Sequence, residues 1–273
     1  MSETVAPSHP FDAAVGLTPA GDGRFAGHTS ADYANMVGPF GGITAAALVR
    51  AVQLHPDRLG DPLSLTVNFA GPVAEGQFDI SARPVRTNRS TQHWALELTQ
   101  DGVVATTATA VFGTRRDTWS SDEITIPAVP AADSVAPESF PDFIAWARNY
   151  EMRFVEGGIP KLESVEHPTS TSTLWVRDTP ARPLDFPALT AMSDVFFPRV
   201  FLRRGKFVPA GTVTLTVYFH ADAAALAEQA DTAVLGSARA QRFGKGYFDQ
   251  SAELWGRDGV LLATAHQLVY SKD

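Results

Sequence analysis

The sequence contains no cysteine, and that absence excludes several kinds of chemistry. Disulfide bonds, thiolate nucleophiles and zinc–thiolate centres all require cysteine, so this chain uses none of them. No run of about 18 consecutive apolar residues occurs, so we expect no helix that spans a membrane. The N-terminal stretch MSETVAPSHPFDAAVG lacks a basic region followed by an apolar run. We therefore expect no signal peptide and interpret the protein as cytoplasmic.

Several familiar motifs are missing as well. The absence of GxSxG argues against a serine α/β-hydrolase. No HExxH or other metal-ligand spacing appears, and the glycines form neither GxGxxG nor a GxxxxGKS or GxxxxGKT loop. The sequence therefore predicts no metal site and no cofactor.

The composition is that of a globular protein with a substantial core. Hydrophobic residues make up 44% of the 273 residues and charged residues 19%, which argues against a disordered chain. The formal net charge of -8 argues against nucleic acid or an anionic membrane as the main partner. A basic cluster at Arg203, Arg204 and Lys206 suits an anionic ligand, but such a cluster is more often a solvated helix end.

Three segments of the chain occur twice, in the same order and at slowly growing offsets, which indicates two halves of similar fold. The matched segments are LTVNF at 65–69 with LTVYF at 215–219, ITAA at 43–46 with LTAM at 189–192, and 97–112 with 253–270. The segment between the halves is rich in Pro, Ser, Ala and Asp, as linkers are. We therefore assign an N-terminal repeat to 1–118, a linker to 119–142 and a C-terminal repeat to 143–273.

Each half begins with a predicted helix and continues with predicted strands. The helices span 41–55 and about 185–203. Apolar and polar residues alternate through 64–71 and 213–220, which predicts strands. Further strands form two predicted hairpins, 90–99 with 103–112 and 247–255 with 260–270. A helix followed by an antiparallel meander, present twice, is an α+β fold.

Five segments resemble the type II acyl-CoA thioesterases and their thioesterase-like relatives. They are GHTSADYANMVGPFGGITAAAL at 27–48, SLTVNFAGPVAEGQFDI at 64–80, the Ser-Asp pair at 193–194, 211–220 and 253–269. The resemblance implies a double hotdog fold, in which two long helices are each wrapped by a curved antiparallel sheet. It also implies hydrolysis of a fatty acyl-CoA, or a related acyl thioester, to a free acid and a thiol. We expect an acyl-CoA of medium or long chain length, which would release CoA.

The resemblance also implies three catalytic residues. Asp194 matches the helix acid of the family, Thr212 the hydroxyl residue and Gln267 the amide, which together hold the attacking water. The family often carries an acid two positions after the hydroxyl residue, where this chain has Thr214.

The residue types suit that chemistry independently, since thioester hydrolysis needs a held water, a proton acceptor and oxyanion donors. A carboxylate in an apolar helix has a raised proton affinity, as a general base requires. Gln267 lies on the apolar face of its predicted strand, so its side-chain amide needs a buried hydrogen-bond partner. Thr212 lies opposite the apolar stripe of its strand, so it reaches the site only if a bend or bulge intervenes, and Thr214 is the alternative. A structural role for Asp194, paired with Arg199 or Arg203, stays open.

The helix that begins at Gly41 and Gly42 offers a second candidate element. Backbone N–H groups at a helix N-terminus suit a developing oxyanion, so these glycines are predicted to bind substrate. Glycines that permit close helix–sheet packing are the alternative. Leu48 stands where the repeat places the counterpart of Asp194, so we expect one working site per chain.

Other assignments stay open from the sequence alone. A non-hydrolytic acyl-CoA-binding protein is the main functional alternative, and a hotdog hydratase would need an Asp–His pair that 168–219 lacks. The CoA phosphates are expected near Arg86 and Arg89 or near Arg203, Arg204 and Lys206. By analogy with other hotdog proteins we expect a homodimer or a higher homo-oligomer.

Overall fold

The computed structural model of the protein describes residues 9–161 and 165–272. Residues 1–8, part of the stretch in which no signal peptide is expected, lie outside the described residues. Within the part that is described, no helix is both long and apolar enough to cross a membrane.

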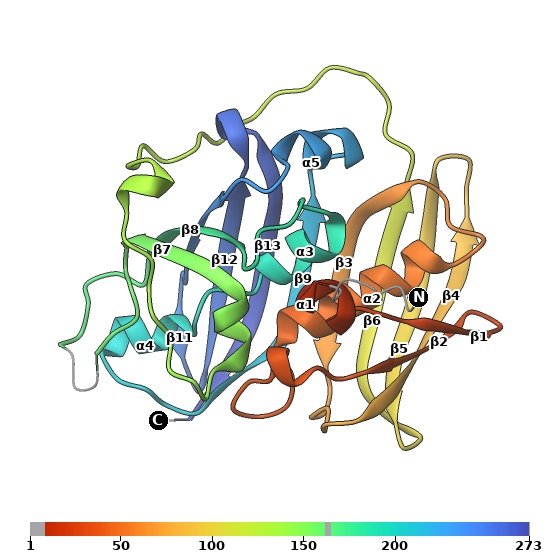
Figure 1. Ribbon diagram of the computed structural model, residues 1–273, viewed down its shortest axis with the longest axis horizontal. Coiled ribbons are helices and arrows are strands. Elements are labelled where there is room, and N and C mark those ends of the chain that lie inside the picture. The colour runs from red at the N-terminus through yellow and green to blue at the C-terminus, as the bar shows by residue number, and fades with distance from the viewer. Residues whose placement is uncertain (1–8, 162–164, 273) are drawn as a thin grey trace, which may run out of the picture.

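A single antiparallel sheet runs through the whole molecule (Figure 1). Its strands follow the order β1-β2-β4-β5-β6-β3-β9-β13-β12-β10-β8-β7, and the short β11 pairs with β12. The strand bounds are β1 Thr18–Gly21, β2 Arg24–His28, β3 Asp61–Phe69, β4 Gln77–Thr87, β5 Thr91–Gln100, β6 Val103–Gly113, β7 Tyr150–Glu156, β8 Ser172–Asp178, β9 Ala210–Phe219, β10 Val234–Arg239, β11 Phe243–Gly244, β12 Tyr247–Trp255 and β13 Leu261–Ser271.

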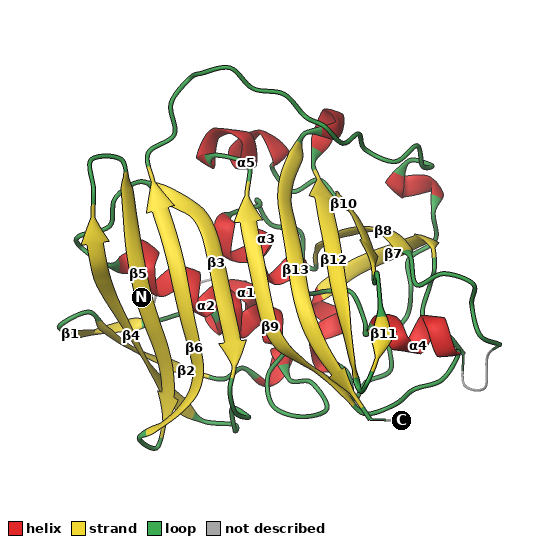
Figure 2. Cartoon of the chain, turned by 180° about the vertical axis from the view of Figure 1, so that it is seen from behind, coloured by secondary structure: helices red, strands yellow, loops and turns green. Residues whose placement is uncertain are grey.

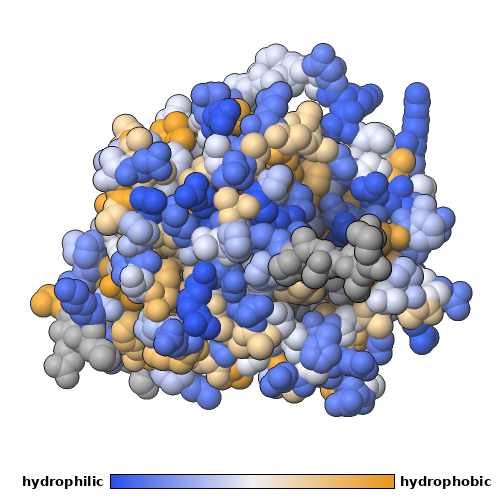
Figure 3. All heavy atoms as spheres, in the orientation of Figure 1, coloured by the Kyte–Doolittle hydropathy of each residue, from blue (hydrophilic) through white to orange (hydrophobic). Residues whose placement is uncertain are grey.

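The α-helices α1, α2 and α3 lie on one face of this sheet, and the view from behind shows the opposite face without helices (Figure 2). The helix bounds are α1 Pro10–Ala14, α2 Gly41–Leu54, α3 Phe186–Met192, α4 Arg199–Arg204 and α5 Ala223–Gln229. The long helix α2 is buried almost throughout because its apolar residues meet both the sheet and α3. On the helix-bearing face, apolar and charged side chains are interspersed (Figure 3).

The first and second parts of the sheet meet at β3 and β9, which pair antiparallel at its centre. The inward side chains Leu65, Val67, Leu215 and Val217 along this junction are fully buried. Residues 114–144 then carry the chain over the top of the sheet from β6 towards β7 (Figure 1). The core therefore continues across the junction of the two parts.

Most of the predicted elements are confirmed. The helix expected at 41–55 is α2, and both predicted hairpins are present as β5–β6 and β12–β13. Asp101, Gly102, Asp258 and Gly259 adopt positive φ values at the two hairpin turns, as tight turns require. The pattern did not predict β7, β8 or α5.

The single helix predicted at about 185–203 is wrong. The chain forms α3 and α4 instead, with a non-helical segment between Met192 and Arg199. Pro198 has no N–H to donate to a preceding carbonyl, and it disfavours the helical conformation of Phe197. The break leaves Asp194 just beyond the end of α3 and not inside a helix.

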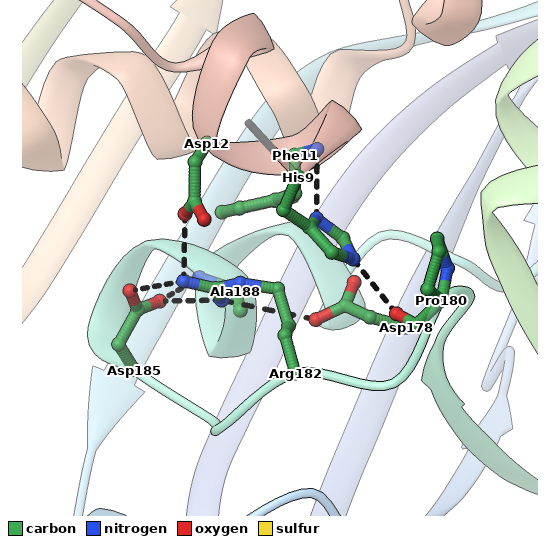
Figure 4. Close-up of polar contacts among 8 residues, drawn as sticks. All are labelled: His9, Phe11, Asp12, Asp178, Pro180, Arg182, Asp185 and Ala188. Atoms are coloured by element: carbon green, nitrogen blue, oxygen red, sulfur yellow. Dashed lines mark hydrogen bonds and ion pairs between the residues drawn. The ribbon is translucent and has the colours of Figure 1, made fainter. Parts of the chain in front are cut away.

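A cluster of charged side chains holds the start of α3 in place (Figure 4). Asp185 caps the helix by accepting a hydrogen bond from the Ala188 N–H at 2.9 Å. Arg182 donates to both carboxylate oxygens of Asp185, at 2.9 and 3.3 Å, and to Asp12 of α1 at 2.8 Å. Asp178 lies 3.8 Å from the same guanidinium. The cluster thus ties α1 to the helix that leads to Asp194.

The Asp185→Ala substitution is expected to lower the free energy of unfolding by about 1 kcal/mol or somewhat more, because an N-cap is lost and Arg182 loses a partner. Chemical denaturation measures the change. Asp185→Asn is the matched control, since it keeps an oxygen for the Ala188 N–H and loses only the charge. A destabilisation by Asn equal to that by Ala would contradict the capping role.

Candidate active site

Asp194 lies between the end of α3 and the start of α2, on the inner side of the sheet. Its side chain is partly buried, and its neighbours Ser193, Val195 and Phe196 are buried. The Gly42 backbone N–H donates a hydrogen bond to the carboxylate. The N-terminus of α2, from the first half of the chain, therefore contacts the acid contributed by the second half.

Gln267 of β13 is the main side-chain partner of Asp194. Its Nε2 donates to Asp194 Oδ1 at 2.8 Å, and only 4% of Gln267 is exposed. Thr212 Oγ1 in turn donates to Gln267 Oε1 at 3.0 Å. The structure thus brings the three sequence-predicted residues into one hydrogen-bonded chain.

A β-bulge places Thr212 on the inner face of the sheet. In the β9–β13 ladder Leu268 pairs with Thr214 while the next residue, Val269, pairs with Thr212, so Val213 is the extra residue. Val269 is 3% exposed and faces inward, which puts Thr212 on the inward side with Gln267. The bend that the sequence required for Thr212 is therefore present. Thr214 pairs with the outward-facing Leu268, so it is not the hydroxyl residue of this network.

The environment of Asp194 makes it a weak acid. Burial raises the pKa of Asp194 to about 7, against the lowering effects of the hydrogen bonds from Gln267 and from the Gly42 N–H. Because two donors remain in place, the ionised form is accessible near neutral pH. A carboxyl group with this pKa can accept a proton from water and release it again under physiological conditions.

The glycines at positions 41 and 42 allow the start of α2 to approach Asp194 and α3 closely. A side-chain Cβ on Gly41 would lie 2.8 Å from Asp194 Oδ2 and 3.4 Å from the Phe69 ring. A Cβ on Gly42 would lie 2.7 Å from the Ala191 carbonyl oxygen. Any larger residue at Gly41 would therefore press against Asp194 Oδ2 and displace it. The close approach at Gly42 is to the Ala191 carbonyl of α3, and the Gly42 N–H contacts Asp194 itself.

The structural pairing of Asp194 with Arg199 or Arg203 is not observed. Arg199 donates to Gln250, Ser172 and backbone carbonyls. Arg203 donates to the His167 carbonyl and lies 3.8 Å from Glu166. Neither arginine contacts Asp194. The partners that hold the Asp194 carboxylate are Gln267 and the Gly42 N–H.

The remaining candidates have different surroundings. Leu48 is a fully buried core residue of α2. Arg86 donates to Asn88, and Arg204 donates to Glu166 at 3.2 Å. These contacts favour neither basic cluster as the site of the CoA phosphates.

Three residues near the site were not singled out from the sequence. Phe69, the last residue of β3, lies beside the Gly41 position. Tyr150 of β7 is buried, and burial together with nearby charges, Asp194 among them, raises its pKa. Gln250 pairs directly with Gln267 across β12 and β13. A signal did exist for Gln250, because it shares its parity with the buried Phe248, Ala252 and Leu254.

The site combines a proton acceptor, an amide and a hydroxyl group in one hydrogen-bonded chain. This set can hold a water molecule and remove its proton. Hydrolysis by direct attack of water needs these groups together with a donor for the oxyanion.

Comparisons with known proteins identify the family of the chain. The family model for the acyl-CoA thioesterase N-terminal domain matches residues 30–113, and the model for the C-terminal domain matches residues 127–271. No curated protein sequence matches the chain.

Solved structures are similar over nearly the full length. A protein of unknown function with a hot dog fold from Alicyclobacillus acidocaldarius is 49% identical, with a TM-score of 0.94 and coverage of 98% of this chain and 99% of that one. The tesB protein of Mycobacterium avium subspecies paratuberculosis is 20% identical, with a TM-score of 0.78 and coverage of 97% and 100%. The acyl-CoA thioesterase II TesB2 of Mycobacterium marinum is 17% identical, with a TM-score of 0.77 and coverage of 96% and 98%. The matches to both domain models and to hotdog structures show that the chain belongs to the type II acyl-CoA thioesterase family, with a hotdog fold.

Proposed function

We propose that the protein is an acyl-CoA thioesterase that hydrolyses its substrate by direct attack of water. The observation that carries this proposal is the chain from Thr212 through Gln267 to Asp194, which ends on a carboxyl group whose pKa is about 7. No covalent intermediate is required, since Asp194 can activate water without becoming a nucleophile itself.

In the proposed reaction the water is bound by the Asp194 carboxylate, through the oxygen that does not accept from Gln267. Asp194 takes a proton as the water oxygen bonds to the thioester carbonyl carbon. The C–S bond then breaks, and the proton held by Asp194 passes to the departing CoA sulfur. Gln267 and Thr212 position Asp194, whose carboxylate also holds the Gly42 N–H. The N–H of Gly41 and the dipole at the N-terminus of α2 favour the oxyanion.

We further propose that the fold is a double hotdog of two fused repeats, 1–118 and 143–273, joined by the linker 119–142. The sheet supports this, because the order β4-β5-β6-β3 is mirrored by β9-β13-β12-β10. Thr66 pairs with Thr216, its counterpart in the sequence repeat, and their Oγ1 atoms lie 3.1 Å apart. An approximate two-fold axis therefore passes between equivalent residues. One working site per chain is part of this proposal, since Leu48 replaces the acid in the first repeat.

We expect an acyl chain of medium or long length and a homodimer or higher homo-oligomer in the cytoplasm. The family membership supports an acyl-CoA substrate. Thiol release from a panel of acyl-CoAs, from acetyl to palmitoyl, tests the activity and the chain length together. Binding without turnover at every length would favour the non-hydrolytic alternative.

The Asp194→Asn substitution is expected to lower kcat/KM at least about a hundredfold, because the general base is lost while its shape is kept. Thiol release from the best acyl-CoA of the panel measures the change. Asp258→Asn, at a hairpin turn with φ of 60° that asparagine tolerates, is the matched control. Unchanged turnover by a folded Asp194→Asn protein would leave a thioesterase with a different site.

The pH dependence follows from the raised pKa of Asp194. Activity is expected to rise with pH through a midpoint near 7, because only the ionised carboxylate accepts a proton. Folding stability is affected in the opposite direction. The folded-state pKa lies above the unfolded value of 3.8, so ionisation costs stability as the pH rises from about 4 through 7. Asp194→Asn should therefore raise the Tm more at pH 8 than at pH 5, and an equal gain at both would refute the raised pKa.

The Gly41→Ala substitution is expected to reduce kcat at least about tenfold, because the added methyl group would lie only 2.8 Å from Asp194 Oδ2 and displace the carboxylate. Steady-state kinetics measure the loss, and circular dichroism checks the fold. The control is Gly71→Ala, where an added Cβ would have no neighbour closer than 4.0 Å. Full activity of Gly41→Ala would show that the observed position of the Asp194 carboxylate is not required for the reaction.

A further inference from the structure

Several unpaired polar atoms are buried between the first part of the chain and the β7–β8 edge of the sheet. The hydroxyl groups of Tyr33 and Tyr150, both carboxylate oxygens of Asp178 and the Nε of Arg182 have no hydrogen-bond partner among the described residues. Tyr33 is 0% exposed, Tyr150 3% and Asp178 2%. Buried polar groups are nearly always hydrogen-bonded, so a set of unpaired ones in one place needs an explanation.

The four side chains are neighbours in the structure, and we call them the tyrosine–Asp178 cluster. Tyr150, the first residue of β7, pairs directly with Asp178, the last residue of β8, so their side chains are adjacent. The rings of Tyr33 and Tyr150 meet edge to face, with their centroids 6.2 Å apart. Arg182 lies 3.8 Å from Asp178, which is too long for a hydrogen bond (Figure 4). The unpaired atoms therefore belong to one buried polar cluster.

The protonation of the cluster leaves it with both donors and acceptors. Burial raises the pKa of each tyrosine, and the charge of Asp178 raises it further, so both phenols stay neutral near neutral pH. Burial raises the pKa of Asp178 to about 7. A neutral phenol donates and accepts, and a carboxyl group keeps an oxygen acceptor in either of its forms.

The tyrosine–Asp178 cluster borders the candidate active site. The ring of Tyr150 contacts the ring of Phe40, with centroids 6.3 Å apart, and Phe40 is the residue directly before Gly41. The charge of Asp194 also contributes to the raised pKa of Tyr150, so the two groups interact. The CoA part of a substrate is large and charged and must extend to solvent. A fully buried cluster beside the thioester therefore meets the acyl side of the substrate.

The charges around the cluster limit the kind of group that it can bind. Arg182 is always cationic and disfavours a second cation. The carboxyl groups of Asp12, Asp178 and Asp185, all within 3.8 Å of that guanidinium, disfavour an anion. A neutral hydroxyl group donates one hydrogen bond and accepts others, so it suits a cluster that holds donors and acceptors together. A plain alkyl chain would leave all of these polar atoms unpaired, which is costly.

We propose that the tyrosine–Asp178 cluster binds a hydroxyl group carried by the acyl chain close to the thioester, and that the substrate class is therefore hydroxyacyl-CoA. This substrate assignment rests on the proposed thioesterase function. Asp178 accepts a hydrogen bond from the substrate hydroxyl group, and Tyr33 and Tyr150 donate to its oxygen. Sites built to hydrogen-bond a substrate hydroxyl group discriminate strongly against the analogue that lacks it.

The test compares octanoyl-CoA with isomers of hydroxyoctanoyl-CoA that carry the hydroxyl group on the second, third or fourth carbon. One of these isomers is expected to exceed octanoyl-CoA at least about tenfold in kcat/KM, measured by thiol release. The isomer hydroxylated on the last carbon is the control substrate, since its hydroxyl group lies far from the thioester and should bring no such gain. Equal kcat/KM values for all five substrates, or a preference for the terminal isomer alone, would overturn the proposal.

Two variants connect the preference to the cluster. Tyr33→Phe and Tyr150→Phe each remove one hydroxyl group and keep the packed ring, so each is expected to lower the preference at least about fivefold. Neither should lower the Tm, because neither hydroxyl group has a partner to lose among the described residues. Tyr218→Phe is the matched control, since Tyr218 of β9 is 52% exposed, and it should keep the wild-type preference. A preference that survives in both cluster variants would overturn the proposal.

A binding measurement separates this proposal from the proposed function. If the wild type hydrolyses none of the substrates, the thioesterase function is refuted, and isothermal titration calorimetry gives the Kd of each acyl-CoA instead. One of the three isomers hydroxylated near the thioester should then bind at least about tenfold more tightly than octanoyl-CoA, and Tyr150→Phe should lose most of that gain. Equal affinities for the hydroxylated and plain substrates would overturn the hydroxyl site.

Discussion

The hydrogen bond from Gln267 to Asp194 is the interaction on which the candidate site depends. A carboxylate that is largely removed from water is costly unless donors surround it, and Asp194 has two, the Gln267 amide and the Gly42 N–H. Two irregular features of the backbone position the residues of this hydrogen-bonded chain. The helix break before Pro198 leaves the acid at the end of α3, and the bulge at Val213 brings Thr212 behind Gln267. These departures from regular structure coincide with the proposed chemistry.

The site also explains why both parts of the chain are needed. Asp194, Thr212 and Gln267 come from the second part, whereas Gly41, Gly42 and Phe69 come from the first. The central pairing of β3 with β9 holds the two parts in register, and α2 packs against α3. A shift at that junction would separate the N-terminus of α2 from the acid. The continuous core therefore positions the site as well as stabilising the fold.

Local patterns were sufficient to predict α2, the two hairpins and the parity of Gln267, because each depends on periodicity or turn chemistry within a short stretch. The break between α3 and α4 was missed, although Pro198 was a visible signal, because the apolar residues around it continue a helical pattern. The bulge that turns Thr212 inward depends on register with β13, which no local pattern contains. The contact of Gly42 with Asp194 likewise joins residues far apart in the chain, so it was not predicted from the sequence.

The central claim is that Asp194 activates water and does not itself attack the thioester. A single turnover in water enriched in oxygen-18, with enzyme in excess over acyl-CoA, tests it most directly. Mass spectrometry of the acid product and of the peptide containing Asp194 locates the label. Direct attack places one oxygen-18 atom in the released acid and none in the peptide. Oxygen-18 in the Asp194 carboxyl group would instead reveal a mixed-anhydride intermediate and contradict the account.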